Sequence, residues 1–126
     1  MSDKKVGDFA WLDISVENAP QLRDFYQKVI GWQVEEVSMG NYSDYSMVNP
    51  NTKEPVSGIC HATGYNANMP AMWLPYFLVE NAEQALNDAL AMGAQQLDEL
   101  KTMGADRFVV IKDPAGACCA LYQRGA

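Results

Sequence analysis

The sequence has little positive charge, one histidine and no long apolar run. Each of these features excludes certain classes of function or partner. Nine Lys and Arg residues stand against sixteen Asp and Glu, a net charge of −7. Nucleic acids and anionic membranes bind proteins through basic surfaces, so we expect neither as a partner. No apolar run approaches the roughly 20 residues that a membrane-spanning helix needs. The opening residues, MSDKKVGDF, lack the apolar core of a secretory signal, so we expect a cytoplasmic protein.

Several familiar chemical signatures are also missing. The three cysteines are odd in number and two are adjacent, which excludes a disulfide framework and favours reduced, packed thiols. No Gly-rich phosphate loop and no Ser-His-Asp signature is present. What remains is a chain of 126 residues, 48% hydrophobic, which is the composition and length of one globular domain.

The four letters VENA occur twice, at 16–19 and at 79–82. Each copy opens a helical pattern, with Asn18 or Asn81 as the expected N-cap and Gly31 or Gly93 at the expected helix end. The apolar faces recur at helical spacing. They comprise Leu22, Phe25, Tyr26, Val29 and Ile30 in the first copy, and Ala82, Ala85, Leu86, Ala89 and Leu90 in the second. The repeat therefore predicts one structural unit written twice.

Strand patterns surround both predicted helices. FAWLDISV, residues 9–16, alternates as a strand with two different faces, whereas WLPYFLV, residues 73–79, is apolar enough for a strand buried on both sides. Three further short strands follow each helix. The fold class predicted is α+β, with tandem βαβββ modules forming a cupped sheet around a cavity. Module 1 spans about 9–61, the linker 62–70 and module 2 about 73–123, within a single domain of residues 1–126.

This order resembles the vicinal-oxygen-chelate superfamily, which includes glyoxalase I, bleomycin-resistance proteins and extradiol dioxygenases. The resemblance rests on DFYQKVIGW in the first half and KDPAGACCALY at the end, and extends over residues 9–123. It implies eight strands around a cavity, a homodimer and, in catalytic members, a divalent metal held by His, Gln or Glu. By the same resemblance, the ligand positions fall on Trp11, Leu74 and Ala120, none of which binds metal.

A fourth ligand position lies in the strand that ends module 1. Aligning EPVSGICH with DPAGACCA places His61 opposite Ala120, and a slip of one residue would place Cys60 there instead. His61 is thus a weak metal candidate, and it is also readily explained as a solvent-facing residue at a strand end. An atypical set of Asp13, His61 and a cysteine is conceivable, although no spacing requires it.

Asp13 lies between Leu12 and Ile14, an unusual place for a charge. Facing a cavity, its carboxylate would suit a general base or a polar anchor for a ligand; the alternative is an ion pair, for example with Arg107. Cys118 and Cys119 leave opposite faces of their strand, so one is expected under a helix and the other toward the cavity. Packing explains Cys118 more simply than catalysis.

The function predicted is that of a glyoxalase or bleomycin-resistance type protein that binds a small molecule and needs no cofactor. The residues predicted to line its pocket are Trp11, Asp13, Tyr76, Cys118 and Tyr122. The aromatic members equally fit a filled core. The alternative is a metal-dependent lyase, isomerase or dioxygenase with an atypical site around His61 and Asp13, so whether the protein is an enzyme stays open, with Asp13 the catalytic candidate.

Overall fold

The computed structural model describes residues 4–125, which divide into two compact units. The first unit comprises residues 12–73, and the second comprises 4–11 together with 74–125. Strand β1 (Phe9–Val16) contributes its first three residues to the second unit and the rest to the first. No helix in the described range is long and apolar enough to cross a membrane.

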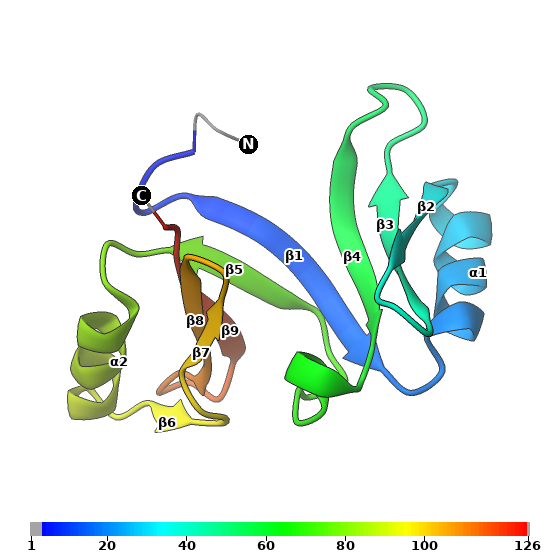
Figure 1. Cartoon of the computed structure of the whole chain (residues 1–126). Coiled ribbons are helices and arrows are strands. Elements are labelled where there is room, and N and C mark those ends of the chain that lie inside the picture. Colours follow the sequence, from blue (N-terminus) through cyan, green and yellow to red (C-terminus); the bar gives the residue numbers. More distant parts are fainter. Residues whose placement is uncertain (1–3, 126) are drawn as a thin grey trace. The chain divides into compact units, whose positions relative to one another are not determined.

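The first unit has the strand order β2-β3-β4-β1 (Figure 1). After β1 come α1 (Ala19–Ile30), β2 (Gln33–Ser38), β3 (Ser43–Val48) and β4 (Pro55–His61), and a 3₁₀ turn, η1 (Gly64–Asn66), follows. The β2–β3 and β3–β4 pairs are antiparallel, whereas β1 runs parallel to β4. A parallel pair needs a crossover connection between its two strands, and α1, β2 and β3 provide it here.

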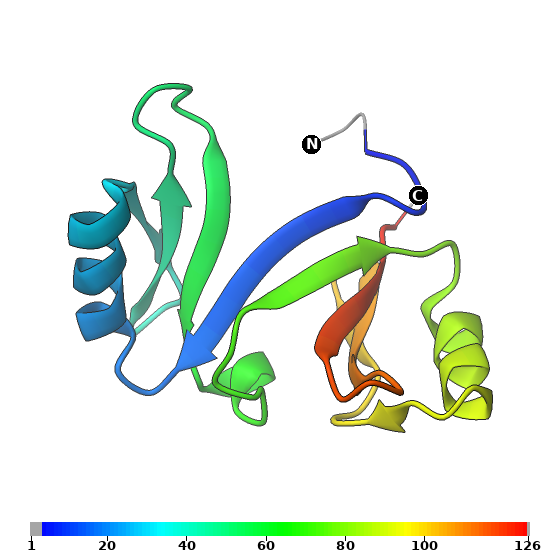
Figure 2. The same ribbon diagram turned by 180° about the vertical axis from the view of Figure 1, so that it is seen from behind.

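The second unit repeats this plan with the order β5-β9-β8-β6 (Figure 2). Its elements are β5 (Leu74–Leu78), α2 (Ala82–Ala91), β6 (Gln95–Gln96), β7 (Lys101–Met103), β8 (Asp106–Lys112) and β9 (Cys118–Gln123). Again the first strand pairs in parallel with the last, and β7 pairs with β8. The predicted α+β class and the tandem plan are confirmed, although β7 was missed and β6 is shorter than expected.

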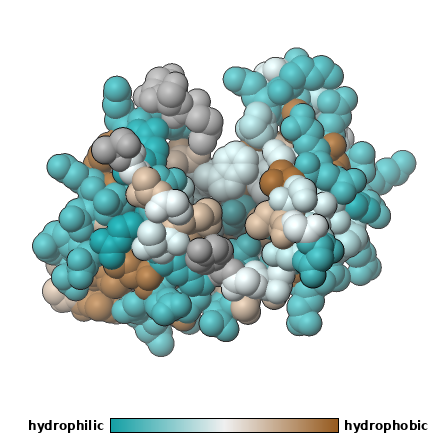
Figure 3. Space-filling view, in the orientation of Figure 1, coloured by the Kyte–Doolittle hydropathy of each residue, from teal (hydrophilic) through white to brown (hydrophobic). Residues whose placement is uncertain are grey.

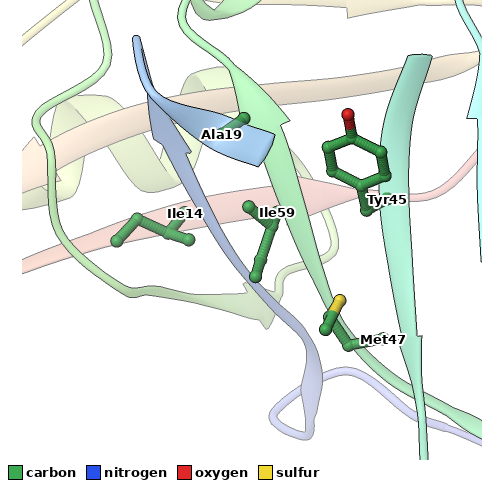
Figure 4. Close-up of a cluster of buried hydrophobic side chains, with 5 residues drawn as sticks. All are labelled: Ile14, Ala19, Tyr45, Met47 and Ile59. Carbon is green, nitrogen blue, oxygen red and sulfur yellow. The ribbon is translucent and has the colours of Figure 1, made fainter. Parts of the chain in front are cut away.

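The core of the first unit lies between α1 and its sheet. Five buried residues form it, and Figure 4 shows them converging from β1, α1, β3 and β4: Ile14, Ala19, Tyr45, Met47 and Ile59. On the outer side of this cluster, the guanidinium carbon of Arg23 lies 4.7 Å from the centre of the Tyr45 ring. Helix α1 thus covers one face of the sheet and leaves the opposite face uncovered.

The aromatic motif in DFYQKVIGW holds α1 against the rest of the first unit. Tyr26 contacts Trp32 and Trp73, with ring centres 5.9 and 5.3 Å apart. The indole N–H of Trp73 donates to the Tyr26 hydroxyl at 3.0 Å. Gly31 ends the helix with φ 90°, a left-handed conformation that glycine tolerates best. The motif that carries the family resemblance therefore stabilises the packing of α1.

Three expectations about the helices and strands are wrong. Asn18 makes no capping bond: its side-chain amide donates to Gln21, and Pro20 in the first turn already removes one backbone N–H that would need a partner. The first helix buries only part of its apolar face, since Phe25 and Val29 are more than half exposed. Ile30 is also more than half exposed. Phe77 on β5 is 40% exposed, so this strand is not buried on both sides.

Apolar side chains also remain on the surface of the second unit. Figure 3 shows hydrophobic atoms gathered at the lower left, over α2. Leu90 and Met92, at the C-terminal end of α2, are exposed large hydrophobic residues. By contrast, Asn81 caps α2 as predicted, accepting the Gln84 N–H at 2.9 Å.

Candidate functional site

The sheet face of the first unit that points away from α1 is built from small and acidic side chains. Ile14, Tyr45 and Ile59 point toward α1, so their neighbours along each strand point the other way. The strand register places Asp13 and Ser46 beside Gly58, and Ser15 beside Cys60. We call this the polar face, and its members are Asp13, Ser15, Asp44, Ser46, Gly58 and Cys60. Asp13, the carboxylate predicted within a strand, thus shares this face with a second carboxylate, Asp44.

Asp44 of the polar face forms a hydrogen-bonded pair with His61, the last residue of β4. Asp44 is 7% exposed, and its Oδ1 accepts the main-chain N–H of His61 at 2.8 Å. The same oxygen lies 3.3 Å from Nδ1 of the His61 ring. With the proton on Nδ1, as this contact requires of a neutral ring, Nε2 is the acceptor nitrogen of a side chain that is 23% exposed. His61 is therefore half-buried and partnered, and the expectation of a histidine that simply faces solvent is wrong.

Cys60 is a protonated thiol in this environment. Burial raises its pKa well above the usual range, and the carboxylates of Asp13 and Asp44 raise it further. A hydrogen bond to Asp44 adds to this effect. A thiolate would be required for nucleophilic attack or for metal binding, so Cys60 serves here as a donor to Asp44.

The positions at which the resemblance implies metal ligands can now be compared in three dimensions. Asp13 pairs with Gly58 and, at the equivalent place in the repeat, Tyr76 pairs with Ala120. Gly58, and not His61, is therefore the counterpart of Ala120. The alignment failed because Pro55 begins β4, whereas Pro114 lies in a turn before β9 begins at Cys118.

These four positions offer no metal donor. They hold Trp11, Gly58, Leu74 and Ala120. Among the residues that the structure describes, no group of three His, Cys, Asp or Glu side chains is placed to hold a metal ion. The residue types at these four positions do not match the His, Gln or Glu ligands that the resemblance implies.

In the second unit, the sheet face away from α2 is aromatic. The ring centre of Tyr76 lies 6.1 Å from that of Phe108 and 6.0 Å from that of Tyr122, and Phe108 stacks on Tyr122. Tyr76 and Phe108 are 6% and 2% exposed. The structure thus brings together two of the predicted residues, in a cluster that is well packed. Their role in ligand binding stays a prediction.

Tyr122 is also fixed by its hydroxyl, which donates to Asp106. Burial and this bond raise the pKa of Tyr122 to about 12. The same bond, with the Gly125 N–H at 2.7 Å, lowers the pKa of Asp106. The polar end of the aromatic cluster is therefore occupied by the protein's own carboxylate.

The remaining predicted site residues are half-buried. Cys119 packs in the core under α2 and Cys118 lies on the opposite face, as the alternation predicted. Burial, Asp113 and Cys118 raise the pKa of the Cys119 thiol. Trp11 belongs to the second unit and Asp13 belongs to the first.

Sequence reasoning missed Asp44, Tyr42 and Phe108. A signal for Asp44 was present, because SDYSMV alternates as clearly as the strand that drew attention to Asp13. The ring of Tyr42 lies 5.2 Å from that of His61, centre to centre. No spacing in the sequence links 42 or 44 to 61, because the link is made by pairing of β3 with β4.

Comparisons with known proteins agree with this architecture. A family model described as the glyoxalase/bleomycin resistance protein/dioxygenase superfamily matches residues 8–118. The anthracycline biosynthesis protein DnrV of Streptomyces peucetius is 27% identical over 92% of this chain and 46% of its own length. The chain thus spans about half the length of this curated relative.

Solved structures share the fold at lower identity. Methylmalonyl-CoA epimerase from Mycobacterium tuberculosis has a TM-score of 0.57 at 13% identity, with 100% of this chain and 93% of that chain covered. The Streptomyces coelicolor epimerase in complex with 2-nitronate-propionyl-CoA has a TM-score of 0.55 at 14% identity, with 97% and 100% covered. These likenesses show the architecture alone.

Proposed function

This chain belongs to the glyoxalase/bleomycin resistance protein/dioxygenase superfamily, and we propose that it is a small-molecule-binding member that does not use the family's divalent metal. Family membership favours a binding role. The residues at the four ligand positions do not favour metal-dependent chemistry. The four positions compared above present an indole, a hydrogen, an isobutyl group and a methyl group in place of metal donors.

The observation that carries the proposal is the polar face of the first unit. Asp13 stands there in one row with Gly58 and Ser46, and Ser15 lies one row along, so its neighbours are small. Its carboxylate is half-buried and acts electrostatically on Cys60. A ligand that carries an amine or several hydroxyl groups would find acceptors on this face, and a net charge of −7 would attract a cation.

The test is ligand binding with Asp13 as the variable. A panel of small amines and polyols is screened by thermal shift, and hits are titrated by calorimetry against the wild type and Asp13→Asn. We expect the substitution to weaken binding by roughly tenfold or more, because a charge-assisted hydrogen bond contributes about 1.5–3 kcal/mol. Equal affinity of both proteins for every hit would remove Asp13 from the site.

The competing function is a metal-dependent lyase, isomerase or dioxygenase with an atypical site around His61 and Asp13. Its support is the ordered imidazole of His61, which presents Nε2 as a donor atom. Elemental analysis of protein purified without chelator separates the two. Near-stoichiometric metal that disappears in His61→Ala would overturn the metal-free proposal.

The proposal also includes a pocket lined by Trp11, Tyr76, Cys118 and Tyr122, a cytoplasmic location and a homodimer. The assembly is tested by light scattering, in which a homodimer has a mass of roughly 28 kDa, twice the 13.9 kDa of one chain. A monomer mass across micromolar concentrations would exclude it.

A further inference from the structure

We propose that Asp44 and His61 form a general-base dyad, in which Nε2 of His61 takes a proton from an O–H group of water or of a bound ligand. This goes beyond ligand binding through Asp13, and it rests on a different pair of residues in the first unit.

The first support is that the imidazole is held in one orientation. Asp44 accepts both the main-chain N–H and Nδ1 of His61. The His61 carbonyl accepts the Thr63 N–H at 2.8 Å, so the backbone is fixed on both sides of the ring. Tyr42 and Tyr45 flank the imidazole with ring centres 5.2 and 6.0 Å away. A histidine base must hold the tautomer that leaves one ring nitrogen as an acceptor, and the Nδ1 contact favours that tautomer here.

The second support is the state of the carboxylate. Asp44 is almost fully buried, yet three donors surround it: the His61 N–H, the His61 Nδ1 and the Cys60 thiol. A buried carboxylate that stabilises an imidazolium is the arrangement that lets histidine accept a proton at low cost. The Asp44 carboxylate contacts the ring directly and balances the positive charge that develops on it, while the Arg23 guanidinium lies over the neighbouring Tyr45 ring.

The third support is that the His61 side chain is partly open to solvent. The His61 side chain is 23% exposed although its partner side chain is only 10% exposed. In the step we infer, the O–H bond breaks, its electron pair stays on oxygen, and the proton moves to Nε2. The imidazolium is then paired with Asp44 until the proton passes to solvent.

The chain carries one histidine, which makes the dyad measurable without a known substrate. Nitrogen chemical shifts of the single imidazole report its tautomer directly. We expect the Nδ1–H form in the neutral ring of the wild type and a mixture in Asp44→Asn. The Nε2–H form in the wild type would overturn the proposal, whether or not the variant folds.

The activity probe is 4-nitrophenyl acetate, whose hydrolysis by water forms acetate and 4-nitrophenol. Water loses a proton to Nε2, attacks the carbonyl carbon and expels nitrophenolate. Positioned bases contribute about 10²–10⁴-fold to their own substrates, so for this unpositioned probe we expect a rate roughly tenfold above that of His61→Gln. Asp44→Asn should fall toward the same low rate.

Glu54→Gln is the matched control, since it also converts a carboxylate to an amide but lies in the exposed turn before β4. It should keep the wild-type rate. Equal rates for the wild type and His61→Gln, or for the wild type and a folded Asp44→Asn, would reject the dyad. Trapping of an acetyl group on His61 by mass spectrometry would reject the general-base step in favour of direct attack. If Asp13→Asn loses ligand binding but keeps the wild-type esterase rate, the dyad is supported independently of the Asp13 binding site.

Discussion

At the scale of single residues, two carboxylates of this chain are each paired with a ring on the next strand. Asp44 pairs with His61 between β3 and β4, and Asp106 pairs with Tyr122 between β8 and β9. Each pair joins a carboxylate at the start of one strand to a ring at the end of the next. In the first pair the imidazole keeps a second nitrogen, Nε2, that does not contact Asp44, whereas in the second the hydroxyl donates its one proton to the carboxylate. That difference is why we place chemistry in the first unit.

The Tyr122 hydroxyl makes a prediction about stability and pH. Tyr122→Phe should lower the free energy of unfolding at pH 7 by about 0.5–1 kcal/mol, at the low end for a hydrogen bond because Asp106 is open to solvent. The pKa of Asp106 is lowered on folding, so its contribution is present above pH ~4 and is lost as the pH falls further. The pKa of Tyr122 is raised to about 12, so its contribution is lost between pH ~10 and 12.

Urea unfolding of the wild type and Tyr122→Phe at pH 7, 3 and 11 measures these effects. The variant should lose stability less steeply than the wild type toward both extremes. Asp106→Asn completes a double-mutant cycle, and strictly additive losses from the two substitutions would show that the bond contributes nothing.

At the scale of elements, the two copies of VENA do different work. Asn81 has extended dihedral angles, φ −140° and ψ 113°, and its side chain caps α2. Asn18 has φ −102° and ψ 48° and does not cap α1, which begins with a proline in its first turn. The same four letters therefore predict the strand-to-helix junction correctly in both places, but the capping hydrogen bond forms in only one. The residue after the motif, Pro20 in the first copy, makes the difference.

This asymmetry gives a matched pair of variants. Asn81→Ala should destabilise the protein by about 1 kcal/mol, the usual cost of a lost N-cap, whereas Asn18→Ala should change the stability by only a few tenths of that amount. Chemical denaturation followed by circular dichroism gives both numbers. A larger loss for Asn18→Ala than for Asn81→Ala would contradict the capping geometry of both helices.

Most elements could be predicted from the sequence, and most of the site could not. Strand β1 was predicted to the residue from its alternation, and Gly31 and Gly93 mark the helix ends as expected. β7 is only three residues long and has no alternation to detect, so it was missed. His61 was placed in the wrong register because strand pairing, rather than the letters around two prolines, determines which residues match. Exposure of Phe25 is likewise a tertiary fact, since helical periodicity cannot say how wide a stripe the sheet covers.

At the scale of the whole molecule, the two units share a topology and differ in the chemistry of the sheet face that their helices leave uncovered. In the first unit that face carries Asp13, Asp44 and Ser15, and in the second it carries Tyr76, Phe108 and Tyr122. A duplicated module has thus kept its backbone plan while its side chains diverged. Family membership accounts for the plan, and only the divergent residues can account for a particular function.

The acidic excess predicts how the whole chain responds to salt. Sixteen carboxylates against nine basic groups repel one another in the compact state, so screening should stabilise the fold. Raising NaCl from 10 to 150 mM shortens the Debye length from about 30 to 8 Å, and we expect the Tm to rise by roughly 2–5 °C. Near pH 4.5, the sequence pI, the same addition of salt should change the Tm much less. Scanning calorimetry at the two pH values measures both effects. A Tm that falls with salt at pH 7 would mean that attractive pairs such as Lys101 with Asp98 outweigh the net repulsion.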